Sequence, residues 1–396
     1  MSRTFLGAFA VATMLMIAGS AFADSTATKP GSAKAKQPEI FKKVLRQQGQ
    51  EEVHTYRIPG LTTTKAGSLI AVFDLRYTSA RDLPGDVDVG MMRSTDLGST
   101  WEPMQVILDY PADEPDAHGN GVGDPCVLAD LKTGTIFVAG LWSKGLRGWA
   151  GSGPGMSPDE TGQFVLTRSD DDGRTWSEPI NITSQVKRPE WKLCFQRPGR
   201  GIQLRDGTLV MPAQYKDELD VPHSFFIYSE DHGEHWQASP PVVVGTNLWT
   251  TEAQVAELAN GDILISMRNH DVRKQRAWAT FSRNPRSGKL TDGKWSPVSF
   301  ALNDPQCMGA LVSYTNPEGE HIVLFANPAS KTRRQLLTVY ESRDGGKTWP
   351  VSKLIDSRPS AYSCLTILPD GSIGLLYETG NKHAAETLTF ARFTMP

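Results

Sequence analysis

The sequence predicts an all-β protein, a six-bladed β-propeller, on the strength of two repeated patterns. The first is an eight-residue turn, Ser-x-Asp-x-Gly-x-x-Trp, found at Ser94–Trp101, Ser169–Trp176, Ser229–Trp236 and Ser342–Trp349. The second is a turn glycine followed by an apolar run, found at Gly67, Gly134, Gly207, Gly261, Gly319 and Gly371. Strand-like repeats about 50 to 75 residues apart are typical of propeller blades, so six runs predict six blades.

Each residue type in the eight-residue turn has a structural reason. The Asp accepts backbone N–H bonds across the turn, the Gly takes a positive φ, and the indole packs on neighbouring strands. The gap before the last copy is nearly twice the earlier ones. Ser282–Trp295 fits this gap as a longer, altered copy in which Asn284 replaces the Asp.

The six apolar runs predict strands that are buried on both faces, as the inner strands of a blade must be. Seven residues after the glycine, four runs reach a side chain that can bind a polar ligand: Asp74, Gln214, Arg268 and Glu378. If the blades are equivalent, these four side chains converge on one rim of the central channel.

The N-terminal segment is predicted to lie outside the fold. In residues 1–23, Arg3 precedes an apolar run and Ala21-Phe22-Ala23 supplies a small-x-small cleavage pattern, which is typical of a signal peptide. The apolar run is too short to span a bilayer. Residues 24–38 have the composition of a flexible tether, and residues 39–396 form the predicted single propeller domain. We therefore expect a secreted or periplasmic protein with no membrane anchor.

Composition argues against several classes of function. The formal net charge is -3 and no basic run stands out, so the sequence does not indicate nucleic-acid binding. The histidines lack metal-ligand spacing, and we expect no metal and no cofactor. The four cysteines, Cys126, Cys194, Cys307 and Cys364, form no C-x-x-C pair. Export permits disulfides among them, but their apolar contexts favour buried thiols.

The residues Arg57-Ile58-Pro59, followed by several of the eight-residue turns, resemble the bacterial exported members of the sialidase (neuraminidase) family of glycoside hydrolases. The likeness runs from about Val53 to Phe393. It implies an exo-α-sialidase that removes terminal α-linked sialic acids from glycoproteins, glycolipids and other sialylated glycans, without a cofactor.

Sialic acid carries a carboxylate on its anomeric carbon, and arginine suits this group because its planar fork binds carboxylate bidentately and keeps its charge. The resemblance implies that three arginines share the task. They match Arg57, Arg268 and Arg334, although Arg333 is adjacent to the last and competes for the assignment. Glu378 matches the carboxylate that holds the first arginine in place.

The resemblance also implies the hydrolytic groups. Arg76 followed six residues later by Asp82 matches an arginine at the pocket border and a general acid, with Asp86 and Asp88 as competitors. The Asp of Gly123-Asp124-Pro125 matches the residue that, with Arg76, binds the ring hydroxyl at carbon 4. An Asp before Pro is also an ordinary turn opener.

The last two catalytic positions come from the segments TTEAQVAEL and AYSCLT. Glu252 matches the base, with Glu257 as its rival, and Tyr362 matches the nucleophile. A phenol that arrives neutral and passes its proton to a neighbouring Glu avoids the like-charge repulsion that a second carboxylate would meet at the anomeric carbon. The implied reaction is double displacement with retention, in which Asp82 acts first as acid and then as base.

Other residues are assigned by position alone. The Gly-rich segment 141–155 carries Trp142 and Trp149, and we expect it to form a pocket wall over an N-acetyl group. Gln214 is expected to bond the same group or the glycerol chain, whereas Arg197 and Arg200 are expected to be surface cations.

Two alternatives to hydrolysis remain. One is a binding protein for sialylated glycans that has lost its chemistry, which the presence of Asp82, Glu252 and Tyr362 disfavours. The other is a transferase that uses the same donor, which these residues do not separate from a hydrolase.

Overall fold

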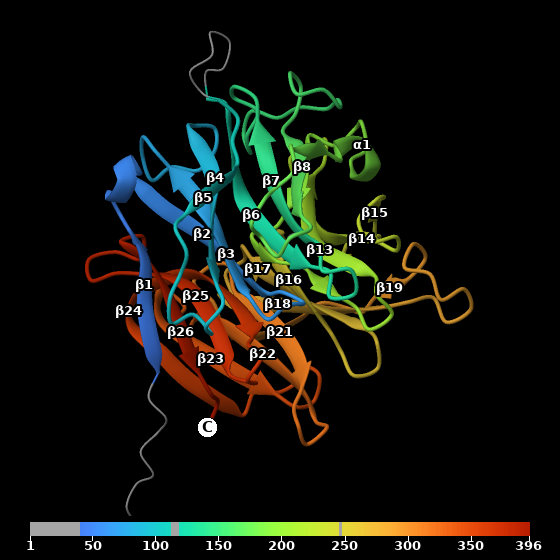
Figure 1. The fold of residues 1–396 in the computed structure, drawn as a ribbon. Coiled ribbons are helices and arrows are strands. Elements are labelled where there is room, and N and C mark those ends of the chain that lie inside the picture. The colour runs from blue at the N-terminus through green and yellow to red at the C-terminus, as the bar shows by residue number, and fades with distance from the viewer. Residues whose placement is uncertain (1–39, 112–118, 245–247) are drawn as a thin grey trace, which may run out of the picture. The chain divides into compact units, whose positions relative to one another are not determined.

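Antiparallel strands make up almost all of the regular structure in the computed structural model, which describes residues 40–111, 119–244 and 248–396 (Figure 1). Within these ranges there are 26 strands, one four-residue helix, α1 (Thr183–Val186), and one 3-10 turn, η1 (Gln50–Glu52). The all-β prediction is confirmed. The predicted signal peptide, 1–23, and tether, 24–38, lie outside the described residues.

The strands form five sheets. In the order of strand pairing, the first is β2 (Thr55–Thr63), β3 (Leu69–Arg76), β4 (Val87–Ser94) and β5 (Gln105–Leu108). The second is β11 (Gly199–Arg200), β6 (Gly121–Ala129), β7 (Ile136–Ser143), β8 (Gln163–Ser169) and β9 (Ile180–Asn181). The third is β10 (Leu193–Gln196), β13 (Leu209–Lys216), β14 (Pro222–Ser229) and β15 (Gln237–Ala238), with β12 (Ile202–Gln203) also on β13.

The fourth sheet is β16 (Thr250–Glu257), β17 (Ile263–Asn269), β18 (Gln275–Ser282) and β19 (Lys294–Trp295), with β20 (Ser299–Asn303) also on β18. The fifth has seven strands: β1 (Phe41–Gln47), β26 (Thr387–Phe393), β25 (Ile373–Thr379), β24 (Val351–Ile367), β23 (Gln335–Ser342), β22 (His321–Pro328) and β21 (Ala310–Thr315). The first strand of the described chain, β1, therefore pairs with its last, β26.

The two repeated patterns have the predicted geometry. All six turn glycines of the second pattern have φ between 79° and 102°. In the turn at Ser169, Asp171 Oδ1 accepts bonds from the Ser169 hydroxyl at 2.8 Å and the Thr175 N–H at 2.9 Å, and the Gly173 N–H reaches the Ser169 hydroxyl at 2.9 Å. Because this network satisfies the polar groups of the turn within eight residues, the motif folds the same way wherever it recurs.

The eight-residue turns also join neighbouring sheets. A Cβ at Gly98 would collide with Phe390 of the last sheet, and one at Gly233 would collide with Phe137 of the second. The indole of Trp236 meets the same Phe137 edge to face, with ring centroids 6.1 Å apart. Glycine is therefore required here by close contact as well as by its positive φ.

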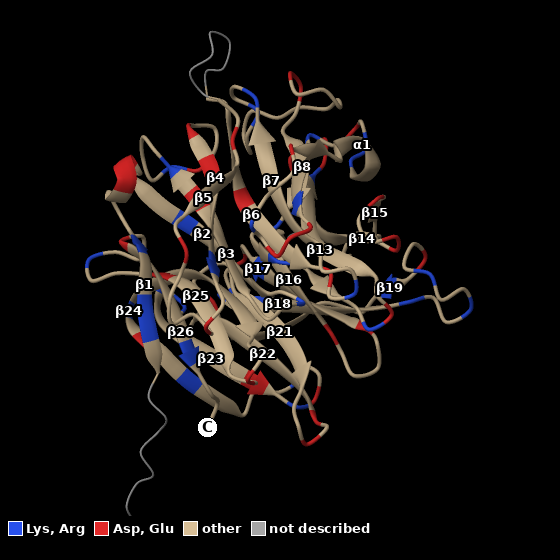
Figure 2. Ribbon diagram, in the orientation of Figure 1, with Lys and Arg blue, Asp and Glu red and all other residues tan. Residues whose placement is uncertain are grey.

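The hydrophobic core lies between successive sheets. Ile70 of the first sheet and Val138 of the second share one cluster, and Phe73 of the first sheet shares another with Cys364 and Phe390 of the last. Strand β2 contacts both β6 and β24, so the first sheet packs against the second and the last. Most strand positions are uncharged, and charges of both signs are scattered through the loops (Figure 2).

Asp171 should make its turn sensitive to acid. Hydrogen bonds from Thr175 lower the pKa of Asp171 to about 2, so its contribution to stability is present above its unfolded pKa of about 4 and is lost as the pH falls toward 2. We expect Asp171→Asn to lower the melting temperature by a few degrees at neutral pH, and the two proteins to converge in acid. Thermal melts across this pH range, with the exposed Glu218→Gln as control, measure the effect, and a gap that is constant with pH would contradict it.

Candidate functional site

Four inner strands carry a one-residue β-bulge at the same level, and four of the predicted site residues, Arg57, Asp124, Glu252 and Tyr362, lie at these bulges. The register slips by one residue in β2 between Arg57 and Gly60, and in β6 between Gly123 and Cys126. It slips again in β16 at Glu252 and in β24 between Ser360 and Ser363. A bulge re-aims side chains out of the regular alternation, so these four strands point functional groups toward the same end of the fold.

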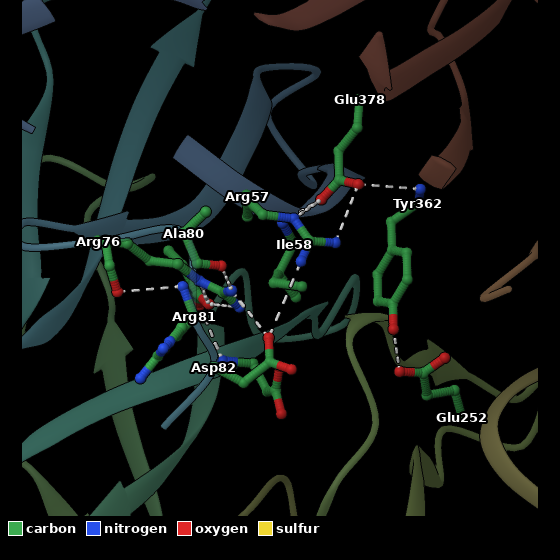
Figure 3. A network of polar contacts seen from close by, with 12 residues as sticks. Arg57, Ile58, Arg76, Ala80, Arg81, Asp82, Glu252, Tyr362 and Glu378 are labelled. Carbon is green, nitrogen blue, oxygen red and sulfur yellow. Dashed lines mark hydrogen bonds and ion pairs between the residues drawn. The ribbon is translucent and has the colours of Figure 1, made fainter. Parts of the chain in front are cut away.

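Glu378 connects the first and last sheets at this end. Its carboxylate accepts bonds from Arg57 Nε at 3.0 Å and Nη2 at 3.1 Å, and from the backbone N–H groups of Ile58 at 2.9 Å and Tyr362 at 3.2 Å. Its side chain is 1% exposed. The carboxylate thus sets the position of both the arginine and the tyrosine (Figure 3).

Tyr362 lies among the three predicted arginines. Arg268 Nη1 donates to its hydroxyl at 3.2 Å, and the guanidinium carbons of Arg57 and Arg334 lie 5.2 and 5.6 Å from its ring centre. Its hydroxyl donates to Glu252, which also accepts a bond from Arg268 at 2.8 Å. Three arginines from distant parts of the chain therefore meet at one aromatic ring.

The surroundings of Tyr362 and Glu252 shift the pKa values of these two groups in opposite directions. Burial, followed by the neighbouring Glu252 carboxylate, raises the pKa of Tyr362 well above its usual value. Burial alone would raise the pKa of Glu252, but the guanidinium groups of Arg268 and Arg197 outweigh it and lower that pKa to about 2. At neutral pH the site therefore holds a protonated phenol that donates to an ionised carboxylate.

A second cluster of polar side chains, centred on Arg76, lies at the pocket mouth. Arg76 is 1% exposed and contacts Asp82 Oδ1 through Nη1 at 2.8 Å, while its Nη2 donates to Asp74 at 2.8 Å. The other oxygen of Asp74 accepts the Asp124 N–H at 2.8 Å. Asp82 itself is 78% exposed, and Asp82 and Asp124 both line the pocket.

The pocket has a volume of about 380 Å³ and two kinds of wall. One wall is polar and includes Arg268, Glu252 and Tyr362. The other is apolar, and its side chains come from several loops and strand ends: Leu83, Leu141, Trp149, Phe195, Pro222 and Trp249. A ligand that fits both walls has charged or hydroxylated groups on one side and an apolar group on the other.

Geometry distinguishes the assigned residues from their sequence competitors. Arg334 faces Tyr362, whereas Arg333 is exposed. Glu257 is the last residue of β16 and pairs with Arg205, at the opposite end of the strand from the pocket-lining Glu252. Gln214 is 1% exposed and lines the pocket as predicted.

Two predictions from position were wrong. Trp142 is not a pocket residue: it stacks on Tyr110 with ring centroids 4.3 Å apart and donates to Asn120, because its neighbour Leu141 takes the pocket-facing side of β7. In a strand, adjacent side chains point to opposite faces. Trp149 of the same segment does line the pocket.

Arg197 and Arg200 are not surface cations. Arg197 is 4% exposed and lies 3.5 Å from Glu252, and Arg200 donates to the Leu365 carbonyl of the last sheet at 3.3 Å. The sequence held a signal for Arg197. It stands ten positions before Gly207, as Arg57 stands before Gly67 and Asp124 before Gly134.

Sequence reasoning also missed His270 and Phe195, which line the pocket. Burial and the nearby Arg268 lower the pKa of His270 to about 4, so its ring is neutral when it bonds Thr251 at 2.8 Å. The four cysteines are buried and unpaired in the structure, as their contexts indicated.

In the described ranges, no three or more His, Cys, Asp or Glu side chains are grouped to hold a metal ion. Nor does any helix there have the length and apolar character needed to cross a membrane.

Fold and pocket together define the class: an all-β protein whose strand ends gather arginines and carboxylates around a tyrosine. A family model, the BNR repeat-like domain, matches residues 76–375. The chain is 40% identical over 357 residues to a sialidase of Bacteroides fragilis and 35% identical over 370 residues to one of Micromonospora viridifaciens. These matches cover 86% and 88% of this chain, which spans 62% and 54% of the two relatives.

Among solved structures, the Hadza microbial sialidase Hz136 is 44% identical with a TM-score of 0.80, over 88% of this chain and 68% of that one. The chain belongs to the sialidase family and carries its BNR repeat-like domain.

Removal of the Glu378 carboxylate should destabilise the protein strongly. Glu378→Ala leaves the Arg57 guanidinium without its buried partner, a change that costs about 3–5 kcal/mol in comparable pairs. We expect a loss of this size in the free energy of unfolding from urea titration. The matched control is Glu257→Ala, which breaks a pair whose arginine is 56% exposed and should cost about 1 kcal/mol or less. Equal losses in the two variants would contradict a special role for Glu378.

Proposed function

We propose that this protein is an exo-α-sialidase that hydrolyses terminal α-linked sialic acids on glycoproteins, glycolipids and other glycans. One observation carries the proposal: the Tyr362 hydroxyl donates to Glu252 while Arg57, Arg268 and Arg334 surround the ring. Family membership supports the same conclusion.

The substrate carboxylate would occupy the space between the three arginines. Arg57 is already held by Glu378, so its guanidinium needs little reorganisation when the ligand arrives. A preorganised cation stabilises charge at lower cost than one that must be oriented during the reaction. Binding at this point would place the anomeric carbon beside the Tyr362 hydroxyl.

Tyr362 would act as the nucleophile and Glu252 as its base. Because Glu252 has a pKa of about 2, it is ionised at neutral pH and can take the phenol proton as attack begins. The phenol approaches the anionic anomeric centre without a charge of its own. Sialidases that use tyrosine are a recognised exception to the two-carboxylate scheme of glycoside hydrolysis.

Asp82 would protonate the leaving oxygen and then activate water, giving retention of configuration. It is exposed at the pocket mouth, where the rest of the glycan must leave, and its contact with Arg76 at 2.8 Å orients it. Asp124 would bind the hydroxyl at carbon 4. Burial, followed by repulsion from Asp74, raises the pKa of Asp124 to about 7, so it can donate as well as accept near neutral pH.

We further propose that the five sheets represent six blades of a closed propeller. Strand β24 is 17 residues long; its first part pairs with β23 and its second with β25. Leu324 of β22 and Leu375 of β25 share one buried cluster, so the two halves of the seven-stranded sheet pack face to face. Two blades linked through a continuous β24 account for both facts.

The N-terminal sequence supports export of the protein to the periplasm or medium. N-terminal sequencing of the exported chain would test this, with Asp24 expected as the first residue.

Loss of the Tyr362 hydroxyl should abolish turnover. We expect Tyr362→Phe to lower kcat on a fluorogenic aryl sialoside by about 100-fold or more, the scale on which one positioned catalytic group acts. Tyr340→Phe, a tyrosine outside the pocket, should retain activity. Wild-type turnover in a folded Tyr362→Phe protein would rule out this nucleophile.

Product analysis separates hydrolysis from its alternatives. With a galactoside acceptor present, proton NMR should show free sialic acid, with the α-anomer formed first. A sialylated acceptor or an anhydro sugar would indicate a transferase, and binding without turnover would indicate a glycan-binding protein.

Asp82→Asn should discriminate between leaving groups. An aryl leaving group departs with little protonation, whereas a sugar alcohol needs an acid. We therefore expect kcat/KM to fall by about 100-fold or more on sialyllactose and much less on a nitrophenyl sialoside. Equal losses on the two substrates would assign Asp82 a role other than acid catalysis.

A further inference from the structure

Arg276 is a buried arginine that bonds three backbone carbonyls near the site. It lies in β18 and its side chain is 0% exposed. Its Nε donates to the Ser266 hydroxyl at 2.8 Å, and its Nη1 donates to Asp304 at 3.1 Å and to the Cys307 carbonyl at 2.7 Å. Its Nη2 donates to the carbonyls of Glu252 at 3.1 Å and Ser266 at 3.4 Å. A guanidinium has five N–H groups in a rigid plane, so these bonds use all of them and leave the side chain one position.

The bond to the Glu252 carbonyl falls on the bulge of β16. The pairing of β16 with β17 passes directly from Thr251 to Ala253, so Glu252 has no place in the ladder. A buried carbonyl outside the ladder needs a donor from elsewhere, and Arg276 supplies it. The guanidinium therefore holds the backbone from which the Glu252 carboxylate reaches Tyr362.

The same guanidinium holds segment 304–307. Asp304 is 1% exposed, and its Oδ1 accepts the Cys307 N–H at 2.9 Å while its Oδ2 pairs with the guanidinium. Because the Cys307 carbonyl bonds the guanidinium as well, both ends of the segment are fixed. Between them lies Gln306, with a φ of 60°, and its carbonyl accepts a bond from Arg334 Nη2 at 3.1 Å. The segment thus sets the position of the third arginine of the site.

The segment also adjoins the tyrosine. Cys307 and the next residue, Met308, share one buried cluster with Tyr362. The hydroxyl of this tyrosine meets the Glu252 carboxylate. Because Arg276 bonds both the segment and the bulge, a shift of its side chain would move the base and the surroundings of the phenol together.

A buried ion pair is a poor source of stability by itself. Its desolvation cost is about as large as its attraction, so apolar side chains of similar size often give an equally stable protein. Apolar side chains cannot bond carbonyls of β16, β17 and segment 304–307 at once. The pair of Arg276 and Asp304 therefore contributes position more than stability.

We propose that Arg276, held by Asp304, is a positioning residue that sets the Glu252 base and the Arg334 guanidinium relative to Tyr362. The inference rests on the proposed function. Arg276 and Asp304 lie outside the pocket lining, so they act on the reaction only through the groups they hold.

The test measures kcat on a fluorogenic aryl sialoside in Arg276→Met, Arg276→Lys and Arg93→Met. Arg93 is the matched control, because it is also buried, at 4% exposed, and pairs with Glu102 and Asp172 away from the pocket lining. The number of binding-competent sites comes from calorimetry with 2,3-didehydro-2-deoxy-N-acetylneuraminic acid, an analogue of the flattened sugar ring. Dividing turnover by this number removes the effect of unfolded protein.

We expect Arg276→Met to lower kcat per competent site by about 10- to 100-fold, the effect of a displacement of about 1 Å in a catalytic group. Arg276→Lys should restore part of it, because an ammonium keeps the charge but has three donors instead of five. Arg93→Met should lower the melting temperature and keep wild-type kcat per site. If Arg276→Met fails to fold, the double variant with Asp304→Leu removes both charges and should show the same fall.

Wild-type kcat per site in the Arg276 variants would overturn the proposal and leave Arg276 a structural residue. Crystal structures give a readout that needs neither ligand nor turnover. The contacts of Tyr362 with Glu252 and of Arg334 with Gln306 should lengthen in Arg276→Met and persist in Arg93→Met, and their persistence in both would also overturn it. If the contacts lengthen but the wild-type protein hydrolyses no sialoside, the positioning stands and the proposed hydrolase does not.

Discussion

The site depends on one buried carboxylate. Glu378 accepts bonds from the Arg57 side chain and from the backbone of Ile58 and Tyr362, and so joins the first and last sheets where the pocket forms. Its burial is tolerable because its oxygens receive four hydrogen bonds, one pair of them bidentate from a guanidinium. Apolar packing and hydrogen bonds such as that from the Thr63 hydroxyl to the Ile367 carbonyl also join the first and last sheets, but they do not specify where a tyrosine and an arginine meet.

The bulges explain how otherwise regular sheets direct polar side chains into the pocket. A strand without a bulge alternates its side chains between two packed faces, and only residues near its end, such as Gln214 of β13, reach the pocket. One extra residue in each of four inner strands breaks this alternation at the level of Arg57, Asp124, Glu252 and Tyr362. The positive φ values at Ile58 (61°) and Asp124 (57°) show how far the backbone departs from the strand there.

The pocket has two regions that differ in their charged groups. Around Tyr362, guanidinium groups outnumber carboxylates, which suits an anionic ligand and an ionised base. At the mouth, Asp74, Asp82 and Asp124 cluster near Arg76, where burial raises the pKa of Asp124 and proton exchange with hydroxyl groups becomes possible near neutral pH. The apolar wall beside Arg197, which includes Phe195 and Trp149, contributes no charge.

The sequence by itself determined the repeats and the all-β class, because the eight-residue turns and the turn glycines are local structures whose hydrogen bonds close within a few residues. Most of the candidate site was implied by the resemblance of its motifs to the sialidase family. The sequence also placed Gln214, Arg268 and Glu378 at one rim, since equivalent strands end at equivalent levels. Only the tertiary structure decided that Trp142 faces away from the pocket and that Arg197 is buried beside Glu252. Both outcomes depend on which face of a strand a residue takes and on contacts between sheets, which an apolar run does not specify by itself.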